Sequence, residues 1–181
     1  TAVIAAGMTA AAGYKGIVKK FANSSGIGSV TGFDPRSPGD REDALKAGLL
    51  FMEAVPTGGV RFVSDQTTYS IDNNFVYNSV QAVYVSDLMA LTLIDNFDRL
   101  VVGKSVADMS AAIALGILEA QLFNFKRLKW ITSSDDAIKG YKNPSVTLTG
   151  GVMEISVEVK LAGLIYFVPI AMAISQVEQT A

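Results

Sequence analysis

The sequence predicts an α+β fold in which a mixed sheet packs against two long helices, with an extended strand or arm near the C-terminal end. Apolar residues recur at helical spacing over two long stretches, residues 78–101 and 105–125. Shorter apolar runs separated by tight turns lie on both sides of these stretches, which is typical of strands. Residues 163–177 read GLIYFVPIAMAISQV and are apolar almost throughout. Such a segment needs cover on both of its faces.

The composition is that of an ordinary globular chain. Half of the 181 residues are hydrophobic, 18% are charged, and the formal net charge is −2. This balance lacks the clustered positive charge that nucleic acid requires, so we expect no nucleic acid partner. Histidine and cysteine are both absent, which excludes Ser-His-Asp and Cys-His catalysis, disulfides and most zinc sites. We therefore expect no catalytic residue, no metal site and no cofactor.

Three parts are expected along the chain. They are a short helix with an extended linker at residues 1–36, an α+β core at residues 37–162, and a C-terminal strand or arm at residues 163–181. The chain starts with Thr1 and shows no signal peptide, so we expect it to be part of a longer protein. The apolar run at residues 164–174 contains Pro169 and is much shorter than the ~20 residues that a membrane helix needs. We therefore expect a strand there and no membrane insertion.

The first half of the chain carries clear start and stop signals. Residues 1–13 are rich in Ala and end at Gly13, which predicts a short helix with a left-handed cap. A second helix is predicted from Ser37, as its N-cap, through Pro38 in the first turn to Gly48. Two apolar runs then flank the sequence PTGG at residues 56–59, which predicts a hairpin with a short loop.

The two central stretches are predicted to be long helices. The first covers residues 78–101 and ends at Gly103. The second is expected to begin at Ser105, whose hydroxyl forms a capping box with Asp108, and to run to about Phe125. In the first helix one apolar stripe comprises Val80, Tyr84, Leu88, Leu91, Ile94, Phe97 and Val101. In the second helix one stripe comprises Val106, Met109, Ile113 and Ile117, and another comprises Leu115, Leu118, Leu122 and Phe125.

Strands are predicted after the helices. Residues 145–149 and 152–161 flank Gly150 and Gly151, a two-residue loop that suits a primed turn. Polar and apolar residues alternate from residue 153 to residue 161, so one face of this strand is buried and the other is wet. The final segment differs, because Pro169 cannot donate to a ladder and both faces are apolar. One face carries Tyr166, Val168, Ile170, Met172 and Ile174, and the other carries Ile165, Phe167, Ala171 and Ala173.

Three short motifs have weak functional interpretations. Gly103, Lys104 and Ser105 match the end of a phosphate loop, but the earlier glycine of that motif is replaced by Asp98, so a turn between helices is favoured. Asp135 and Asp136 are adjacent acids whose surroundings are typical of a solvated loop. The basic cluster FKRLK, residues 125–129, either pairs with a helix C-terminus or docks on an acidic protein surface. It contains Lys126, Arg127 and Lys129.

The chain resembles the C-terminal half of a contractile bacteriophage tail sheath protein. The likeness follows the order of the helix with DREDALKAG, the hairpin LLFMEAVPTGGVRFVSDQTTYS, the loop IDNNFVYNS, the helix pair, and the tail ending YFVPIAMAISQVEQTA. The strand GVRFVSDQTTY carries it most strongly, and the opening AAGMTAAAGYKGIVKKFANSSGIGSVTG is also similar. The resemblance spans nearly the whole chain, through diffuse motifs of which none is catalytic.

The resemblance implies a structural subunit of the virion tail that is assembled in the host cytoplasm. Such subunits stack as hexameric rings around a tail tube, and their contraction drives the tube through the host envelope. The implied partners are neighbouring sheath subunits, the tail tube protein, and baseplate and tail terminator proteins. Lys126, Arg127 and Lys129 are the candidate tube contact. The implied intersubunit strand contains Tyr166, Phe167, Val168, Ile170, Met172 and Ile174.

Two alternatives remain open at this point. The chain could be a sheath subunit of a tailocin or of another contractile injection system, which the chemistry of the sequence does not distinguish from a phage sheath. It could also be a soluble enzyme domain that uses carboxylates. That hypothesis requires acids that converge in a cleft, whereas the acids in this sequence fall at helix starts and on wet strand faces.

Overall fold

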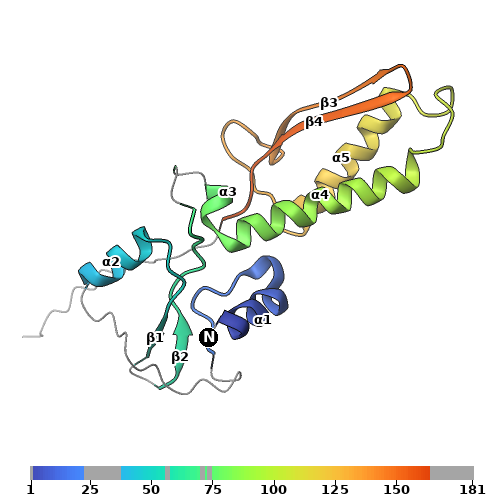
Figure 1. The fold of residues 1–181 in the computed structure, drawn as a ribbon. Coiled ribbons are helices and arrows are strands. Elements are labelled where there is room, and N and C mark those ends of the chain that lie inside the picture. Colours follow the sequence, from blue (N-terminus) through green and yellow to red (C-terminus); the bar gives the residue numbers. More distant parts are fainter. Residues whose placement is uncertain (1, 23–37, 56–57, 70–71, 73–74, 164–181) are drawn as a thin grey trace, which may run out of the picture.

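The computed structural model describes residues 2–22, 38–55, 58–69, 72 and 75–163. Its elements gather into two groups, with the helices and strands of residues 2–62 at one end of the molecule and those of residues 80–159 at the other (Figure 1). This arrangement confirms the α+β class. The expected mixed sheet is not present among the described residues, whose strands form two separate antiparallel pairs. Each pair is a hairpin, and a hairpin can only pair antiparallel.

The first group contains the elements that the punctuation of the sequence predicted. Helix α1, Ala2–Ala12, passes into a 3-10 turn at Gly13–Lys15, and helix α2 spans Pro38–Lys46. Strands β1, Met52–Ala54, and β2, Val60–Phe62, form the predicted hairpin. Gly48 ends α2 at φ 67°, and a Cβ there would clash with the Thr67 carbonyl oxygen. The buried core of this group comprises Ala5, Ile17, Ala22, Met52, Val60 and Phe62.

A segment of the chain itself covers the outer edge of β2. The Lys19 amide donates to the Phe62 carbonyl at 2.8 Å, and the Phe62 amide donates to the Lys20 carbonyl at 3.1 Å. The Ala22 amide adds a third bond, to the Val60 carbonyl at 2.8 Å. Residues 19–22 therefore satisfy backbone groups that would otherwise be left open at a sheet edge.

The long helix α4, Val80–Leu100, starts from a buried polar anchor. The Ser79 hydroxyl accepts from the Ala82 amide at 3.2 Å and donates to the Asp65 carboxylate at 2.8 Å. Asp65, which is only 1% exposed, also accepts from the Gln81 amide at 3.2 Å. Both interactions satisfy donors that have no partner within the helix. The short helix α3, Phe75–Asn78, precedes this anchor.

The buried face of α4 is not the stripe that the sequence suggested. Of that stripe only Phe97 is buried, whereas Tyr84, Leu91 and Ile94 are among the exposed large hydrophobic residues. Apolar residues occur around most of this helix, so its periodicity did not determine which side meets the core. The buried residues of α4 are Gln81, Ala82, Val85, Met89, Asn96 and Phe97.

The second long helix, α5, spans Ala111–Arg127 and starts later than predicted. Its N-cap is Ser110, whose hydroxyl accepts from the Ile113 amide at 3.3 Å. The predicted capping box at Ser105 and Asp108 is wrong, because Ser105 accepts from the Ala107 amide in a turn outside the helix. Ile113 is exposed, and the core side of the helix is the second predicted stripe in large part. It consists of Ala114, Leu118, Leu122 and Phe125.

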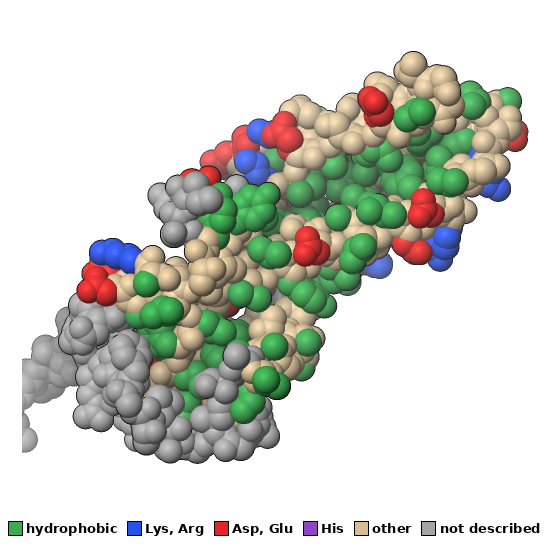
Figure 2. All heavy atoms as spheres, in the orientation of Figure 1, with side chains coloured by type: hydrophobic (Ala, Val, Ile, Leu, Met, Phe, Trp, Pro, Cys, Tyr) green, Lys and Arg blue, Asp and Glu red, His purple; other side chains and the backbone are tan. Residues whose placement is uncertain are grey.

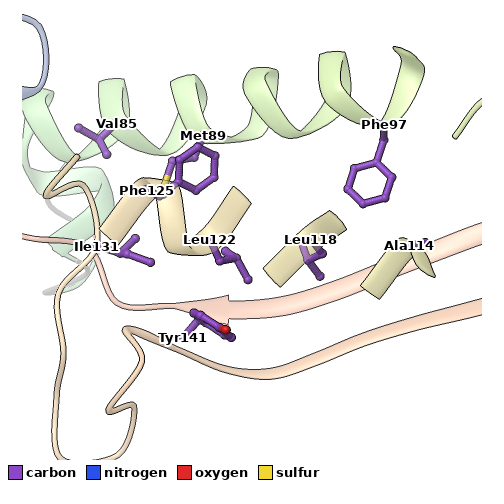
Figure 3. Packing of buried hydrophobic residues seen from close by; sticks show 9 residues of the cluster. All are labelled: Val85, Met89, Phe97, Ala114, Leu118, Leu122, Phe125, Ile131 and Tyr141. Atoms are coloured by element: carbon purple, nitrogen blue, oxygen red, sulfur yellow. The ribbon is translucent and has the colours of Figure 1, made fainter. Parts of the chain in front are cut away.

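Strands β3, Tyr141–Thr149, and β4, Val152–Val159, form a long hairpin packed on α5. Gly150 and Gly151 have φ values of 59° and 84°, as a two-residue primed turn requires. Figure 3 shows the core side chains of α4 and α5 gathered between α4 and the hairpin, with Ile131 and Tyr141 near the end of the cluster that holds Phe125. Of the helices described here, none has the length and apolar character needed to cross a membrane.

Candidate assembly surface

An apolar groove lies between α4 and β4, with α5 beneath it. It has a volume of about 470 Å³. Figure 2 shows hydrophobic side chains filling the trough between the rim formed by α4 and the rim formed by the hairpin. The residues that line it are Ala90, Leu93, Ile94, Phe97, Leu118, Ile155, Ser156 and Val157. Ser156 is the single polar residue in that set, so the groove suits an apolar occupant.

The rim formed by β4 is an open sheet edge among the described residues. Thr149 pairs with Val152 across the two-residue turn, so even-numbered residues of β4 bond to β3. The Lys160 amide continues this alternation by donating to the Gly140 carbonyl at 2.9 Å. The backbone groups of Met153, Ile155 and Val157 therefore face away from β3, and no further described strand pairs with them.

The side chains of the same three residues face the helices. Met153 and Val157 pack against the core of α4 and α5, and Ile155 remains 38% exposed in the groove. An added strand would thus find free ladder groups and an apolar floor in one place. The groove was not predicted from the sequence, because its two rims come from segments about sixty residues apart.

The structure does not place the predicted intersubunit strand. Tyr166, Phe167, Val168, Ile170, Met172 and Ile174 all lie outside the described residues. Their role therefore stays a prediction.

The basic cluster lies where α5 ends. The chain leaves the helix through a Schellman motif, in which the Trp130 amide donates to the Phe125 carbonyl and the Lys129 amide donates to the Lys126 carbonyl, both at 3.0 Å. The rings of Phe125 and Trp130 stack at 5.3 Å, which supplies the apolar contact of that motif. Lys129 occupies the left-handed position at φ 62°. Glycine is the usual residue there, because a side chain is strained in this conformation.

Exposed apolar side chains surround this basic cluster. Phe123 is 66% exposed and Ile138 is 80% exposed. The Lys126 ammonium donates to the Ile138 carbonyl at 3.0 Å, which ties the loop after α5 to the helix end. Sequence reasoning found the three cations but missed these hydrophobic neighbours, because Ile138 comes from a separate loop.

The remaining motifs have structural roles in the described part of the chain. Asp136 accepts from the Ser134 hydroxyl at 2.7 Å and pairs with Lys142 at 3.1 Å and Lys160 at 3.0 Å. These hydrogen bonds hold the pKa of the Asp136 carboxyl well below its usual range, and the one from Ser134 has the largest effect. The carboxylate thus fastens a loop to the base of the hairpin. Lys104 lies in an exposed turn seven residues before the first residue of α5, so no phosphate loop is formed there.

The carboxylate enzyme hypothesis requires acids that converge in a cleft. The lining of the groove contains no acidic residue. No group of three or more acidic side chains among the described residues could hold a metal ion.

Comparison with known proteins shows the fold. No protein family model matches the chain, and no curated protein matches it. Among solved structures, it is similar to a chain of the "Cryo-EM structure of the anti-feeding prophage (AFP) baseplate, 6-fold symmetrised", with a TM-score of 0.62 and 11% sequence identity. The match covers 77% of this chain and 40% of that chain, so this chain spans well under half of its structural neighbour. At this identity the likeness shows that the two chains share a fold.

Proposed function

We propose that this chain is a structural subunit of a contractile sheath. In this proposal it polymerises as stacked hexameric rings around a tail tube, in a phage tail or in a related injection system. The observation that carries the proposal is the open edge of β4 beside an apolar groove. The fold shared with a chain from a contractile injection system baseplate supports the same class of machine.

The occupant that we propose for the groove is the segment at residues 165–177 of a neighbouring copy. This segment is apolar on both faces, so a position between an apolar floor and further protein suits it. About six ladder bonds at ~1 kcal/mol each would hold it. Each buried aliphatic side chain would add ~1.5–3 kcal/mol. These gains offset the cost of ordering the segment, so the joint can persist while subunits move relative to one another.

Pro169 limits how that segment can pair. Proline has no N–H, so its nitrogen must face away from β4, and the amides of Val168 and Ile170 then face β4. Directly opposed residues of an antiparallel pair lie on the same side of the sheet. Antiparallel addition therefore directs the larger face, which includes Ile170 and Met172, toward α5. Parallel addition would direct the face with Ala171 toward α5 instead.

The basic cluster at the end of α5 is proposed to contact an acidic protein surface of the same assembly. Its cations lie beside exposed hydrophobic residues, and interfaces commonly combine complementary charge with an apolar centre. The tail tube is the partner that the resemblance suggests for Lys126, Arg127 and Lys129.

Deletion of residues 165–177 tests this function. We expect the deleted chain to remain folded, with an unchanged circular dichroism spectrum for its helices, and to lose assembly into hollow sixfold cylinders in electron micrographs. Ile170→Asp should reproduce the loss, whereas Ala171→Asp should have a smaller effect. Normal cylinders formed by the deleted chain would rule out the strand, and the reverse order of the two point variants would indicate parallel addition.

A further inference from the structure

The outer face of α4 carries a second exposed surface, which we call the acidic face of α4. It consists of Tyr84, Asp87, Leu91, Asp95 and Asp98, whose spacing of three or four residues places them on one side of the helix. All five side chains are exposed, and Leu91 is 64% exposed. Figure 2 shows acidic side chains spaced along α4 with hydrophobic side chains between them.

The end of α5 carries a surface of the opposite charge, which we call the basic end of α5. It consists of Phe123, Lys126, Arg127, Lys129, Ile138 and Lys139. Glu119 neutralises part of it by pairing with Lys139 at 3.8 Å. Arg127 and Lys129 form no ion pair with another described side chain, and the same is true of Asp87 and Asp98. The two surfaces therefore have free charge of opposite sign, each next to exposed apolar area.

The backbone of Lys129 gives an independent reason to assign a role to the basic end of α5. Its φ of 62° lies in the left-handed region, where a lysine is strained relative to glycine. The side chain is exposed and makes no ion pair with the described residues, so the folded monomer gains little from it. A strained residue whose side chain makes no ion pair with the described residues points to a role in binding.

We infer that the basic end of α5 on one copy of this chain docks on the acidic face of α4 on a second copy. Arg127 and Lys129 would pair with Asp87 and Asp98, and Phe123 and Ile138 would cover Leu91. When each copy uses its two surfaces on two different neighbours the contact is heterologous, and repeated contacts of this kind generate rings or helical polymers. The inference rests on the proposed function in assuming that the chain polymerises, but it uses residues that lie outside the strand joint.

A charge swap in the full chain tests the contact. We expect Arg127→Glu with Lys129→Glu, and separately Asp87→Lys with Asp98→Lys, to weaken self-association at least tenfold in sedimentation velocity experiments. The chain that carries all four changes should recover association, because the pairing is restored with reversed sign. Added salt should weaken the native contact. Lys104→Glu, an exposed charge reversal in the turn after α4, is the matched control and should associate normally.

Lys129→Gly separates binding from folding. The variant should raise the melting temperature, because glycine relieves the left-handed strain, and it should weaken self-association. Gain of stability with unchanged association would contradict the role of Lys129.

Failure of the four-residue swap to restore association would overturn the inference, as would a native chain that stays monomeric. If only the basic changes weaken self-association, the basic end of α5 contacts a different surface of the second copy, and the assignment of the acidic face of α4 as its site is wrong. The strand joint is tested separately. Cylinders that survive deletion of residues 165–177 and still respond to the charge swap would overturn the proposed strand and leave this contact standing.

Discussion

The two hairpins of this molecule differ in what covers their edges. The outer edge of β2 is paired by residues 19–22 of the same chain, through three backbone hydrogen bonds of 2.8 to 3.1 Å. The corresponding edge of β4 has no strand among the described residues, and an apolar groove runs beside it. Both hairpins have similar turn chemistry, with paired glycines at positive φ. The difference therefore lies in the surroundings of the strands.

This difference shows how one chain can combine a hairpin whose edge is covered by its own chain with a hairpin whose edge stays open. A short strand such as β2, with three residues, can be completed by a neighbouring loop. The eight residues of β4 offer a longer ladder, which needs an extended partner. Open edges of that length are aggregation sites unless a specific partner covers them. The apolar groove beside β4 favours a partner strand with apolar side chains, and it thereby restricts which strand can pair with the open edge.

The largest effect on stability is expected from a substitution in the core of the first hairpin, β1 and β2. Phe62 is 1% exposed in the core of the first group, and Phe62→Ala should cost about 3–5 kcal/mol of the free energy of unfolding, through lost burial and a cavity. Chemical denaturation followed by circular dichroism measures this loss. If the two groups fold independently, the core around Leu118 should keep its amide protection in hydrogen exchange. A loss below 1 kcal/mol would show that the covered hairpin is not well packed.

A charge placed in the groove should prevent strand addition at the open edge of β4 without unfolding the chain. Ile155→Asp directs a carboxylate into the groove, and we expect self-association to fall about 100-fold, or ~2.7 kcal/mol. Val152→Asp in the same strand is the matched control, because Val152 is 61% exposed at the hairpin turn and does not line the groove. Sedimentation velocity compares the two variants. Equal association of both would argue against strand addition at β4.

A smaller effect is expected at the ion pairs that tie residue 19 to the first hairpin. Glu53 is buried and accepts from Lys19 at 3.0 Å and from Arg61 at 2.6 Å. Burial alone raises the pKa of the Glu53 carboxyl, but the hydrogen bonds from Lys19 and Arg61 outweigh it and hold that pKa below its ordinary value of 4.5. Glu53→Gln should cost about 1.5–3 kcal/mol at neutral pH.

The pH dependence of this effect follows from the sign of the pKa shift. A depressed folded pKa gives stability that is fully present above 4.5 and is lost as the pH falls through the lower folded value. The difference in unfolding free energy between the native chain and Glu53→Gln should therefore shrink as the pH falls below 4.5. A difference that stays constant over this range would show that the carboxylate is not the stabilising form.

The sequence predicted the elements that are marked by local signals. Gly48, the PTGG loop and Gly150-Gly151 each ended an element or joined two strands where expected, because these conformations depend on the residues at the turn itself. The start of α5 was missed because Ser105 and Ser110 both satisfy the local rules for an N-cap. Only the packing of Ala114 and Leu118 against the hairpin decides between them.

The assembly surfaces could be predicted from the sequence less well than these elements, because they depend on tertiary structure. The stripe with Tyr84 and Leu91 was recognised, but apolar periodicity does not distinguish a core face from an interface, and both residues are exposed. The groove and the left-handed Lys129 left no local signal, because each results from how separate segments meet. The basic cluster was recognised from composition alone, and its partner stays a prediction.

The buried carboxylate of Asp65 has a mechanical consequence. It fastens the first turn of α4 to the segment that leaves β2, through bonds of 2.8 and 3.2 Å. The 21 residues of α4 form a rod about 31 Å long at ~1.5 Å per residue. A force applied at the groove would then be transmitted along this stiff helix to its anchored N-terminal end. We expect the first hairpin to move together with the helix.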